Sequence, residues 1–263
     1  MWSEARCPLW TRFGDTEPMD VPSPRRRGRY GFDAPPALFG LLMGAAPPLV
    51  LGIIFFGQPW GKFLLAIGVF NTISAALFVQ ATRRGKFVVW ARALKSLGLK
   101  GDERIADLGC GRGAVLTMAA EAVPRGRVVG VDLWRSVDQS GNQESVTLAN
   151  AAAEGVADLI ELFTADLREL PFAANEFDVV VSSLAIHNIK DTAQRARALR
   201  EADRVCKPGG RVLIIDISKG SEYADLLRQW GYAVVHRPVG WRMWFGGPWV
   251  AASTVDAIKP GSA

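Results

Sequence analysis

A glycine-rich segment, DLGCGRG at residues 107–113, constrains the fold of this chain more than any other feature. An apolar run at 104–108 leads into it, and a helix-forming run at 112–122 overlaps its end. Glycine allows positive φ and a close approach of a ligand to the backbone, and a helix that begins there presents its free N-terminal amides to that ligand. The segment therefore predicts a strand, a tight turn and a helix that bind a ligand at the carboxyl edge of an α/β sheet.

The pattern from residue 85 onward agrees with this assignment, because short apolar strands alternate with amphipathic helices. Such alternation predicts a Rossmann-like, mainly parallel sheet with helices on both faces. The expected strands are 104–108, 127–132, 159–163, 177–183, 210–216, 232–237 and 249–257, and the expected helices are 88–98, 112–122, 143–154, 191–206 and 221–230.

Three acidic residues follow or end predicted strands and indicate which ligand binds. Asp107 stands two residues before the first glycine, where it would repel a pyrophosphate, and Ala114 occupies the third glycine position of the G-x-G-x-x-G dinucleotide fingerprint. Both features favour a cationic amino-acid sulfonium. Asp132 ends the second strand, where a carboxylate can accept both hydroxyls of a ribose. Asp166, after the third strand, either accepts from an adenine amino group or caps the turn that follows.

Neighbouring side chains complete the predicted site. Leu133 and Trp134 follow the second strand, and either can cover one face of an adenine ring. The buried strand at 177–183 emerges in polar residues, which should face the reacting centre because ligands bind outside the carboxyl ends of strands. His187 is one of only two histidines and is the candidate general base, with a pocket-lining role as the alternative. The polar residues are Ser182, Ser183, His187 and Asn188.

Five segments in order, DLGCGRG, GVDLW, TADLRELPF, FDVVVSSLAIHNI and KPGGRVLIID, resemble the class I S-adenosylmethionine-dependent methyltransferases. RYGFDAP, before the apolar runs, is similar to a bacterial membrane-anchored group of these enzymes. The resemblance implies a seven-stranded sheet with an antiparallel last strand and S-adenosylmethionine as cofactor. It also implies that the glycine loop and the first acid hold the methionine moiety, the second acid the ribose and the third the adenine. The expected cofactor-binding residues are Asp107, Gly109, Cys110, Gly111, Gly113, Asp132, Leu133, Trp134, Asp166, Leu167 and Ser183.

Two long uncharged runs before this domain predict a helical hairpin that crosses a membrane. Residues 37–57 and the run that ends at Thr82 are each long enough for a hydrocarbon core, which requires about 20 apolar residues. Arginine clusters flank the hairpin on one side, so the positive-inside tendency places the catalytic domain on the cytoplasmic side of the cell membrane. A buried helix pair is the alternative, favoured by Pro47 and Pro48 because proline removes helical hydrogen bonds. The predicted domains are a mobile basic tail at 1–36, a transmembrane hairpin at 37–82 and a methyltransferase domain at 85–263.

Composition argues against other classes of function. The net charge of +5 comes largely from basic residues beside the apolar runs, so membrane topology explains it better than nucleic-acid binding. Cys7, Cys110 and Cys206 are odd in number and lack metal-ligand spacing, so neither a disulfide scaffold nor a metal site is expected. Cys110 is interpreted as a small side chain in a tight turn rather than a reactive thiol.

Two further segments are candidates for substrate recognition. Residues 135–144 are an insertion relative to the family pattern, and Asp138, Gln139 and Asn142 there either form a lid or belong to a solvated loop. Residues 239–249 contain three tryptophans between the last two strands. They predict an aromatic wall for an apolar substrate, an anchor at the membrane surface, or a loop packed on the sheet edge.

Together these features predict a methyltransferase that acts on a small hydrophobic acceptor at the membrane surface. The methyl group would move from the sulfonium to an O, S or N nucleophile by in-line displacement, which requires donor and acceptor to be held in line. The expected partners are a lipophilic substrate and membrane lipid, without nucleic acid. The alternatives are a membrane-tethered module that binds S-adenosylmethionine without turnover, and a methyltransferase acting on a membrane-localised protein.

Overall fold

The protein is built around one sheet of seven strands in the order β3-β2-β1-β4-β5-β7-β6. The computed structural model describes residues 26–135 and 139–261. Neighbouring strands are parallel except at β7, which is antiparallel to both β5 and β6. This topology confirms the predicted fold class, including the reversed last strand. The strands are β1 (Arg104–Leu108), β2 (Arg127–Asp132), β3 (Ile160–Thr164), β4 (Phe177–Ser183), β5 (Cys206–Ile217), β6 (Ala233–Pro238) and β7 (Ala252–Ile258).

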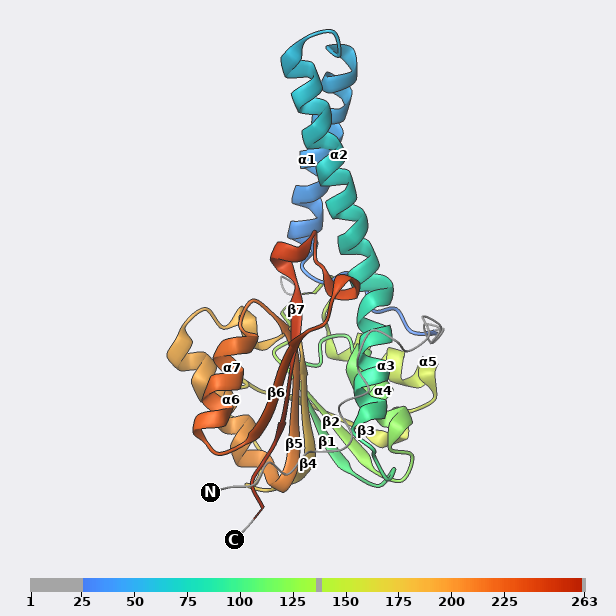
Figure 1. Ribbon diagram of the computed structural model, residues 1–263. Helices are drawn as coiled ribbons and strands as arrows, with labels where there is room; N and C mark the ends of the chain where they lie inside the picture. Colours follow the sequence, from blue (N-terminus) through green and yellow to red (C-terminus); the bar gives the residue numbers. More distant parts are fainter. Residues whose placement is uncertain (1–25, 136–138, 262–263) are drawn as a thin grey trace.

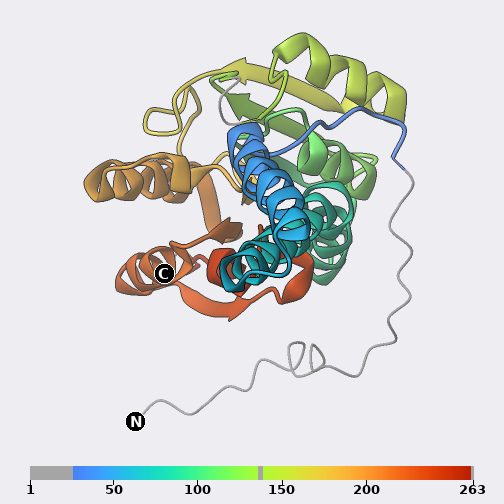
Figure 2. The ribbon, with the colours of Figure 1, turned by 90° about the horizontal axis from the view of Figure 1, so that it is seen from above.

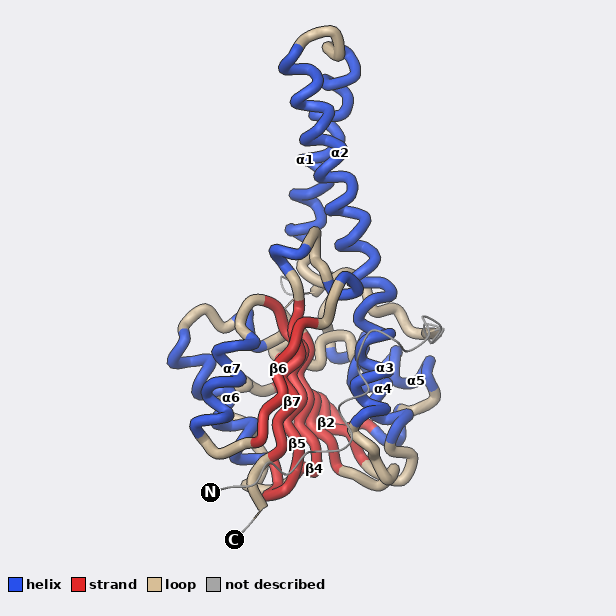
Figure 3. Tube along the Cα trace, viewed as in Figure 1, coloured by secondary structure: helices blue, strands red, loops and turns tan. Residues whose placement is uncertain are grey.

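Helices cover both faces of the sheet, with α3, α4 and α5 on one face and α6 and α7 on the other (Figures 1 and 3). Alternate side chains of each central strand point to opposite faces and so enter two separate cores. In β5, Leu213 and Ile215 belong to one core, and Val212 and Ile214 belong to the other. The helices of the domain are α3 (Lys86–Ser96), α4 (Ala114–Ala122), α5 (Glu144–Glu154), α6 (Thr192–Val205) and α7 (Gly220–Gln229), with short 3₁₀ turns at Ala157–Leu159, Ile186–Asn188, Trp241–Met243 and Pro248–Val250.

Two helices, α1 (Pro35–Ile54) and α2 (Pro59–Gln80), form a hairpin that rises from the carboxyl edge of the sheet (Figure 1). Both are long and apolar enough to cross a membrane. The helices approach closely at Gly68, where a Cβ atom would lie 2.7 Å from the backbone nitrogen of Leu49. α1 stays helical through Pro47 and Pro48, so the proline pair does not divide the first apolar run.

The hairpin continues directly into the sheet domain. A π-helical turn at Ala81–Gly85 joins α2 to α3, so one helix runs from Pro59 to Ser96. At 1.5 Å per residue its 38 residues extend about 57 Å. Seen from above, the hairpin stands over the middle of the domain rather than at its rim (Figure 2). The predicted boundary between residues 82 and 85 is therefore a turn within a helix.

The segment before α1 lies against the sheet domain. Arg26 pairs with Glu121 at 2.6 Å, and the Tyr30 hydroxyl donates to Glu154 at 2.9 Å. The prediction of a mobile tail is thus wrong for residues 26–34, because their partners on α4 and α5 are distant in sequence and leave no local pattern. Residues 1–25 of the predicted tail lie outside the described residues.

Candidate active site

A cavity of about 780 Å³ lies at the carboxyl ends of β1, β2 and β4. The glycine loop, the loops after these strands and the base of the hairpin form its wall. Most of the predicted site residues meet here, and Gly113, Trp134 and Ser182 are the three that do not line the cavity. The predicted residues on its wall are Asp107, Gly109, Cys110, Gly111, Asp132, Leu133, Asp166, Leu167, Ser183 and His187, together with Asn188.

The glycine loop adopts its shape through positive φ angles. Gly109 has φ 77°, and a Cβ atom there would collide with the Cβ of Ala185 from the loop after β4. Gly113 has φ 79° and precedes α4, where a Cβ would lie 2.9 Å from Thr147. Gly113 does not line the cavity, and its contact with the cofactor remains a prediction. Cys110 lines the cavity, and burial raises the pKa of its thiol, which agrees with an inert small side chain.

Asp107 is a buried carboxylate without a partner. Its side chain is 1% exposed, and neither oxygen accepts a hydrogen bond from any described residue. Burial and the nearby Asp132 raise the pKa of Asp107 to about 8. An unpartnered buried acid is costly unless a ligand completes it. Its place on the cavity wall fits the ammonium group of an amino-acid ligand.

Asp132 is held in a fixed orientation at the end of β2. Its Oδ2 accepts from the Gly111 amide at 2.8 Å, and its Oδ1 accepts from Asn142 Nδ2 at 3.1 Å. The carboxylate thereby links the glycine loop to the inserted segment. Asp132 lines the cavity, and its contact with a ribose remains a prediction.

The two residues after Asp132 diverge. Leu133 lines the cavity and is 41% exposed, so it can cover a bound ring. The Trp134 indole instead donates to Thr164 at 2.7 Å, and its backbone has φ 56°. Trp134 therefore does not line the cavity, because the left-handed turn directs its ring toward β3, and its contact with adenine remains a prediction.

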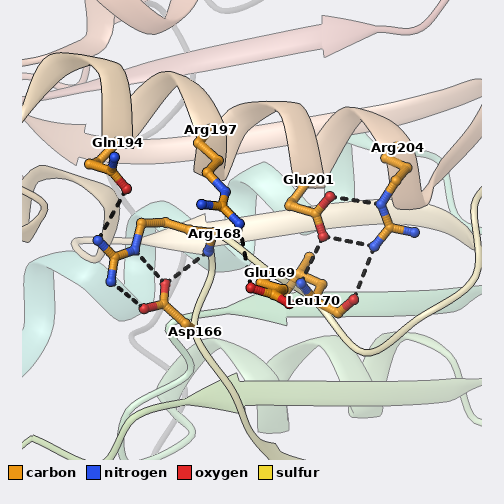
Figure 4. A network of polar contacts seen from close by, with 8 residues as sticks. All are labelled: Asp166, Arg168, Glu169, Leu170, Gln194, Arg197, Glu201 and Arg204. Atoms are coloured by element: carbon orange, nitrogen blue, oxygen red, sulfur yellow. Dashed lines mark hydrogen bonds and ion pairs between the residues drawn. The ribbon is translucent and has the colours of Figure 1, made fainter.

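Asp166 also lines the cavity, but its oxygens already have partners (Figure 4). The Arg168 backbone amide and Nε donate to one oxygen at 2.9 and 2.8 Å, and Arg168 Nη2 donates to the other at 2.5 Å. These contacts lower the pKa of Asp166 to about 2. Arg168 also donates to Gln194 of α6 at 3.2 Å. The geometry matches the alternative of an acid that shapes its own turn, and contact with adenine remains a prediction.

Known proteins resemble the central part of the chain, which contains the glycine loop and His187. Residues 106–214 match the methyltransferase domain family. The chain carries a class I S-adenosylmethionine-dependent methyltransferase domain. Its cofactor is therefore S-adenosylmethionine, and the unpartnered Asp107 beside the glycine loop fits this cationic molecule.

Curated relatives match about half of the chain. The ubiquinone/menaquinone biosynthesis C-methyltransferase UbiE of Syntrophotalea carbinolica is 37% identical over 127 residues, which are 48% of this chain and 49% of that protein. The demethylmenaquinone methyltransferase of Staphylococcus aureus is 31% identical over 133 residues, which are 50% of each chain. The chain thus spans about half the length of the curated relatives it matches.

A solved structure shares the fold. A SAM-dependent methyltransferase from Aquifex aeolicus has a TM-score of 0.50 at 20% identity, over 72% of this chain and 96% of that one. The arrangement of strands and helices in the methyltransferase domain therefore has a counterpart of known structure.

His187 lies in a 3₁₀ turn after β4 of the methyltransferase domain and is tied to Asp216 at the end of β5. Its Nδ1 is 2.5 Å from Asp216 Oδ1, and its backbone amide donates to Oδ2 at 3.0 Å. The Tyr223 hydroxyl donates to the same carboxylate, which is 1% exposed. A carboxylate only accepts, so Nδ1 carries a hydrogen, and in the neutral imidazole Nε2 then has the free lone pair. Sequence reasoning missed Asp216, although this acid lies one residue before the carboxyl end of β5.

The two serines at the end of β4 point to opposite faces. The Ser182 hydroxyl is buried and donates to the Leu108 carbonyl at 2.8 Å, so its predicted place at the reacting centre is wrong. Ser183 lines the cavity, but its Oγ accepts from Trp90 Nε1 at 2.9 Å. Alternation along the strand separates them, as it does for any neighbouring pair.

The inserted segment connects the glycine loop to the base of the hairpin. Gln139 Oε1 accepts from the Arg112 amide at 2.8 Å, and its Nε2 donates to Asp33 at 3.0 Å. Asp33 in turn pairs with the buried Lys86 at 2.9 Å. Gln139 therefore caps the loop rather than lying free in a solvated turn. Asp138 lies outside the described residues.

The tryptophan-rich segment closes the cavity on the hairpin side. Phe245 and Trp249 line the cavity together with Leu41 of α1 and Phe78 of α2. The position of the segment between β6 and β7 had indicated a substrate role. The hairpin residues were not anticipated, because nothing local to an apolar run shows which of its side chains face a cavity formed with distant parts of the chain.

Proposed function

We propose that this protein is an S-adenosylmethionine-dependent methyltransferase that acts on a small lipophilic acceptor at a membrane surface. The single observation that carries the proposal is the cavity, which joins the cofactor loop, His187 and apolar side chains of the hairpin. A reaction between a polar donor and an apolar acceptor needs both environments in one cavity.

The polar wall of the cavity holds the cofactor in this proposal. The ammonium group pairs with Asp107, which removes the cost of leaving that buried acid without a partner. Asp132 accepts from the ribose hydroxyls, and Leu133 covers the adenine ring. The glycine loop allows this close approach of the cofactor to the backbone.

When bound, S-adenosylmethionine supplies an electrophilic methyl group on a sulfonium that departs as a neutral thioether. His187 accepts, at Nε2, the proton that an acceptor hydroxyl or amine gives up. Asp216 holds Nδ1–H and stabilises the imidazolium that results. The acceptor atom is an O, S or N nucleophile. The relative from Syntrophotalea carbinolica is named a C-methyltransferase, so a carbon atom is a further candidate acceptor. His187 would then accept the proton of a hydroxyl next to that carbon.

The hairpin supports placement at a membrane. Only 11% of the most apolar stretch of α1 is buried, which disfavours the alternative of a buried helix pair. Arg83 and Arg84 follow α2 at the domain side, so positive charge favours a cytoplasmic methyltransferase domain. The large exposed apolar side chains of the hairpin include Phe39, Ile53, Ile54, Phe63 and Phe70.

A transfer assay with purified full-length protein in phospholipid nanodiscs tests the proposal. Cofactor labelled in the methyl group is incubated with a bacterial lipid extract, with water-soluble metabolites, or with stripped membrane proteins. We expect label in the organic phase together with stoichiometric S-adenosylhomocysteine. Label confined to water-soluble products would contradict the lipophilic acceptor, and label in the protein fraction would favour the membrane-protein alternative.

The same preparation separates an enzyme from a binding module. Calorimetry measures S-adenosylmethionine binding, and product analysis measures S-adenosylhomocysteine. Binding without product from all three acceptor pools would support the module that binds the cofactor without turnover.

A further inference from the structure

The hairpin side of the cavity has a packed wall. Ala37 and Leu41 are four residues apart on α1, so they project from one face of that helix, and both line the cavity. Phe78 of α2 and Phe245 meet edge to face at 5.5 Å and are 3% and 8% exposed. These side chains present a continuous apolar surface to the cavity.

The wall meets the outside of the molecule at Trp249. This residue lines the cavity and is nevertheless 61% exposed. Its ring stacks on Phe70 of α2 at 5.4 Å, and Phe70 is 53% exposed on the hairpin surface. Tryptophan is enriched where protein crosses from water to lipid. At Trp249 the apolar wall of the cavity therefore reaches the outer surface of the molecule, beside the hairpin.

Charge is missing from this part of the cavity wall. Every cavity-lining residue contributed by α1, α2 and the 245–250 segment is uncharged. Asp33 and Lys86 line the cavity just outside these helices, but they pair with each other at 2.9 Å. A polar cofactor gains nothing from such a surface. A hydrocarbon chain gains about fourfold in affinity for each methylene group that it buries.

We propose that this apolar end is a subsite for the hydrocarbon tail of the methyl acceptor, which enters from the bilayer past Trp249. The acceptor is then an amphiphile, with a proton-bearing polar head beside His187 and a tail between Leu41, Phe78 and Phe245. The inference rests on the proposed function and extends it, because it assigns the substrate class and the direction from which the substrate arrives.

Photolabelling tests the subsite without requiring turnover. The probe is a dodecylphenol with a diazirine in its tail, added to full-length protein in nanodiscs with S-adenosylhomocysteine bound. Peptide mapping should find adducts in both 37–41 and 245–250. A methylphenol carrying the same diazirine should give at least tenfold fewer adducts there, since it lacks the methylenes that the subsite buries.

Two variants fill the subsite, and one matched variant does not. Leu41→Trp and Ala37→Phe place bulk in the cavity, whereas Leu42→Trp places it on the neighbouring residue, which is 50% exposed and does not line the cavity. We expect Leu41→Trp and Ala37→Phe to lower the number of tail adducts roughly tenfold. This factor corresponds to the affinity lost when about two methylene groups are no longer buried. Leu42→Trp should leave labelling unchanged. The dissociation constant for S-adenosylmethionine, measured on all three, should stay at the wild-type value and report that the fold is intact.

The possible outcomes distinguish this inference from the proposed function. Adducts confined to the lipid-facing side of the hairpin, or equal labelling of all three variants, would overturn the subsite. If Leu41→Trp and Ala37→Phe methylate a lipid extract as fast as wild type, the subsite is also wrong, although the methyltransferase assignment stands. If no extract is methylated by wild type while the adducts appear as expected, the proposed function fails and the apolar subsite remains.

Discussion

The hairpin and the sheet domain treat apolar side chains in opposite ways. In the sheet domain Ile105, Leu199 and Ile215 are fully buried, whereas Ile53 and Phe63 of the hairpin are each 66% exposed. A protein core accounts for the first group, and a lipid environment would account for the second. Because the cavity belongs to both regions, changes in the domain should affect chemistry and cofactor binding. Changes in the hairpin should affect insertion and the apolar acceptor.

The largest effect should follow removal of the imidazole from the domain side of the cavity. His187→Ala is expected to lower kcat by roughly 10²–10⁴-fold, which is the usual contribution of a positioned general base. Cofactor affinity should be unchanged, since Asp107 and Asp132 remain. Product formation and calorimetry measure the two quantities. Normal turnover by this variant would contradict the assignment of the base.

A charge in the hairpin should break membrane insertion and leave the domain intact. Met43 lies near the middle of α1 and is 52% exposed. If it faces lipid, Met43→Lys costs about 2.5–3.5 kcal/mol of insertion free energy. If it faces water, the change should stay within about 0.5 kcal/mol. Carbonate extraction of membranes distinguishes the two cases. We expect carbonate to release Met43→Lys from the membrane and to leave the control, Met43→Leu, in it.

Removal of the strand-terminal acid should weaken cofactor binding alone. A hydrogen bond to a charged group contributes about 1.5–3 kcal/mol, so Asp132→Ala should raise the Kd for S-adenosylmethionine roughly 10- to 100-fold. Titration calorimetry checks the value. Membrane insertion should be that of wild type, and an unchanged Kd would remove Asp132 from the cofactor site.

Loss of Asp216, which contacts His187, should alter the imidazole more than it alters cofactor binding. Asp216→Asn should convert the Nδ1–H form of His187 partly to the Nε2–H form and lower kcat by at least roughly tenfold, the lower limit for a hydrogen bond to a charged group. The chain has only two histidines, so ¹⁵N spectra of histidine-labelled protein can report this directly. His236→Gln assigns the second signal, and an unchanged tautomer would show that Asp216 does not position the ring.

The smallest effect concerns a proton on Asp107. With its pKa raised to about 8, the free protein holds this proton at pH 7, and binding of the cationic cofactor should release nearly one proton. Affinity should rise by up to about tenfold per pH unit as pH approaches 8. Calorimetry in buffers of different ionisation enthalpy counts the proton. Asp107→Asn should release about one proton fewer than wild type when the cofactor binds.

The same raised pKa affects stability without cofactor. The unfolded chain loses the Asp107 proton near pH 4, whereas the folded protein keeps it until about pH 8. The folded state therefore binds more protons in this window, and stability should fall as pH rises through it. Thermal melts of wild type and Asp107→Asn separate this contribution from other groups.

Local patterns predicted much of the site. The glycine loop lies between β1 and α4 as expected, and Asp107, Asp132 and Asp166 all line one cavity. Each lies at or just beyond the end of a parallel strand, and such ends converge at one edge of a sheet. The direction in which a single side chain points was less predictable. Trp134 turns away because its φ is 56°, which no neighbouring residue type indicated.

The sequence by itself determined the order of strands and helices, the glycine loop and its acids, and two apolar helices, because these depend on residues close together in the chain. Only the tertiary structure decided that Asp216 holds His187 and that Gln139 caps the glycine loop. It also decided that Leu41 and Phe78 share a cavity with the glycine loop. These contacts join residues 27 or more positions apart, so they exist only once the sheet has brought its edges together.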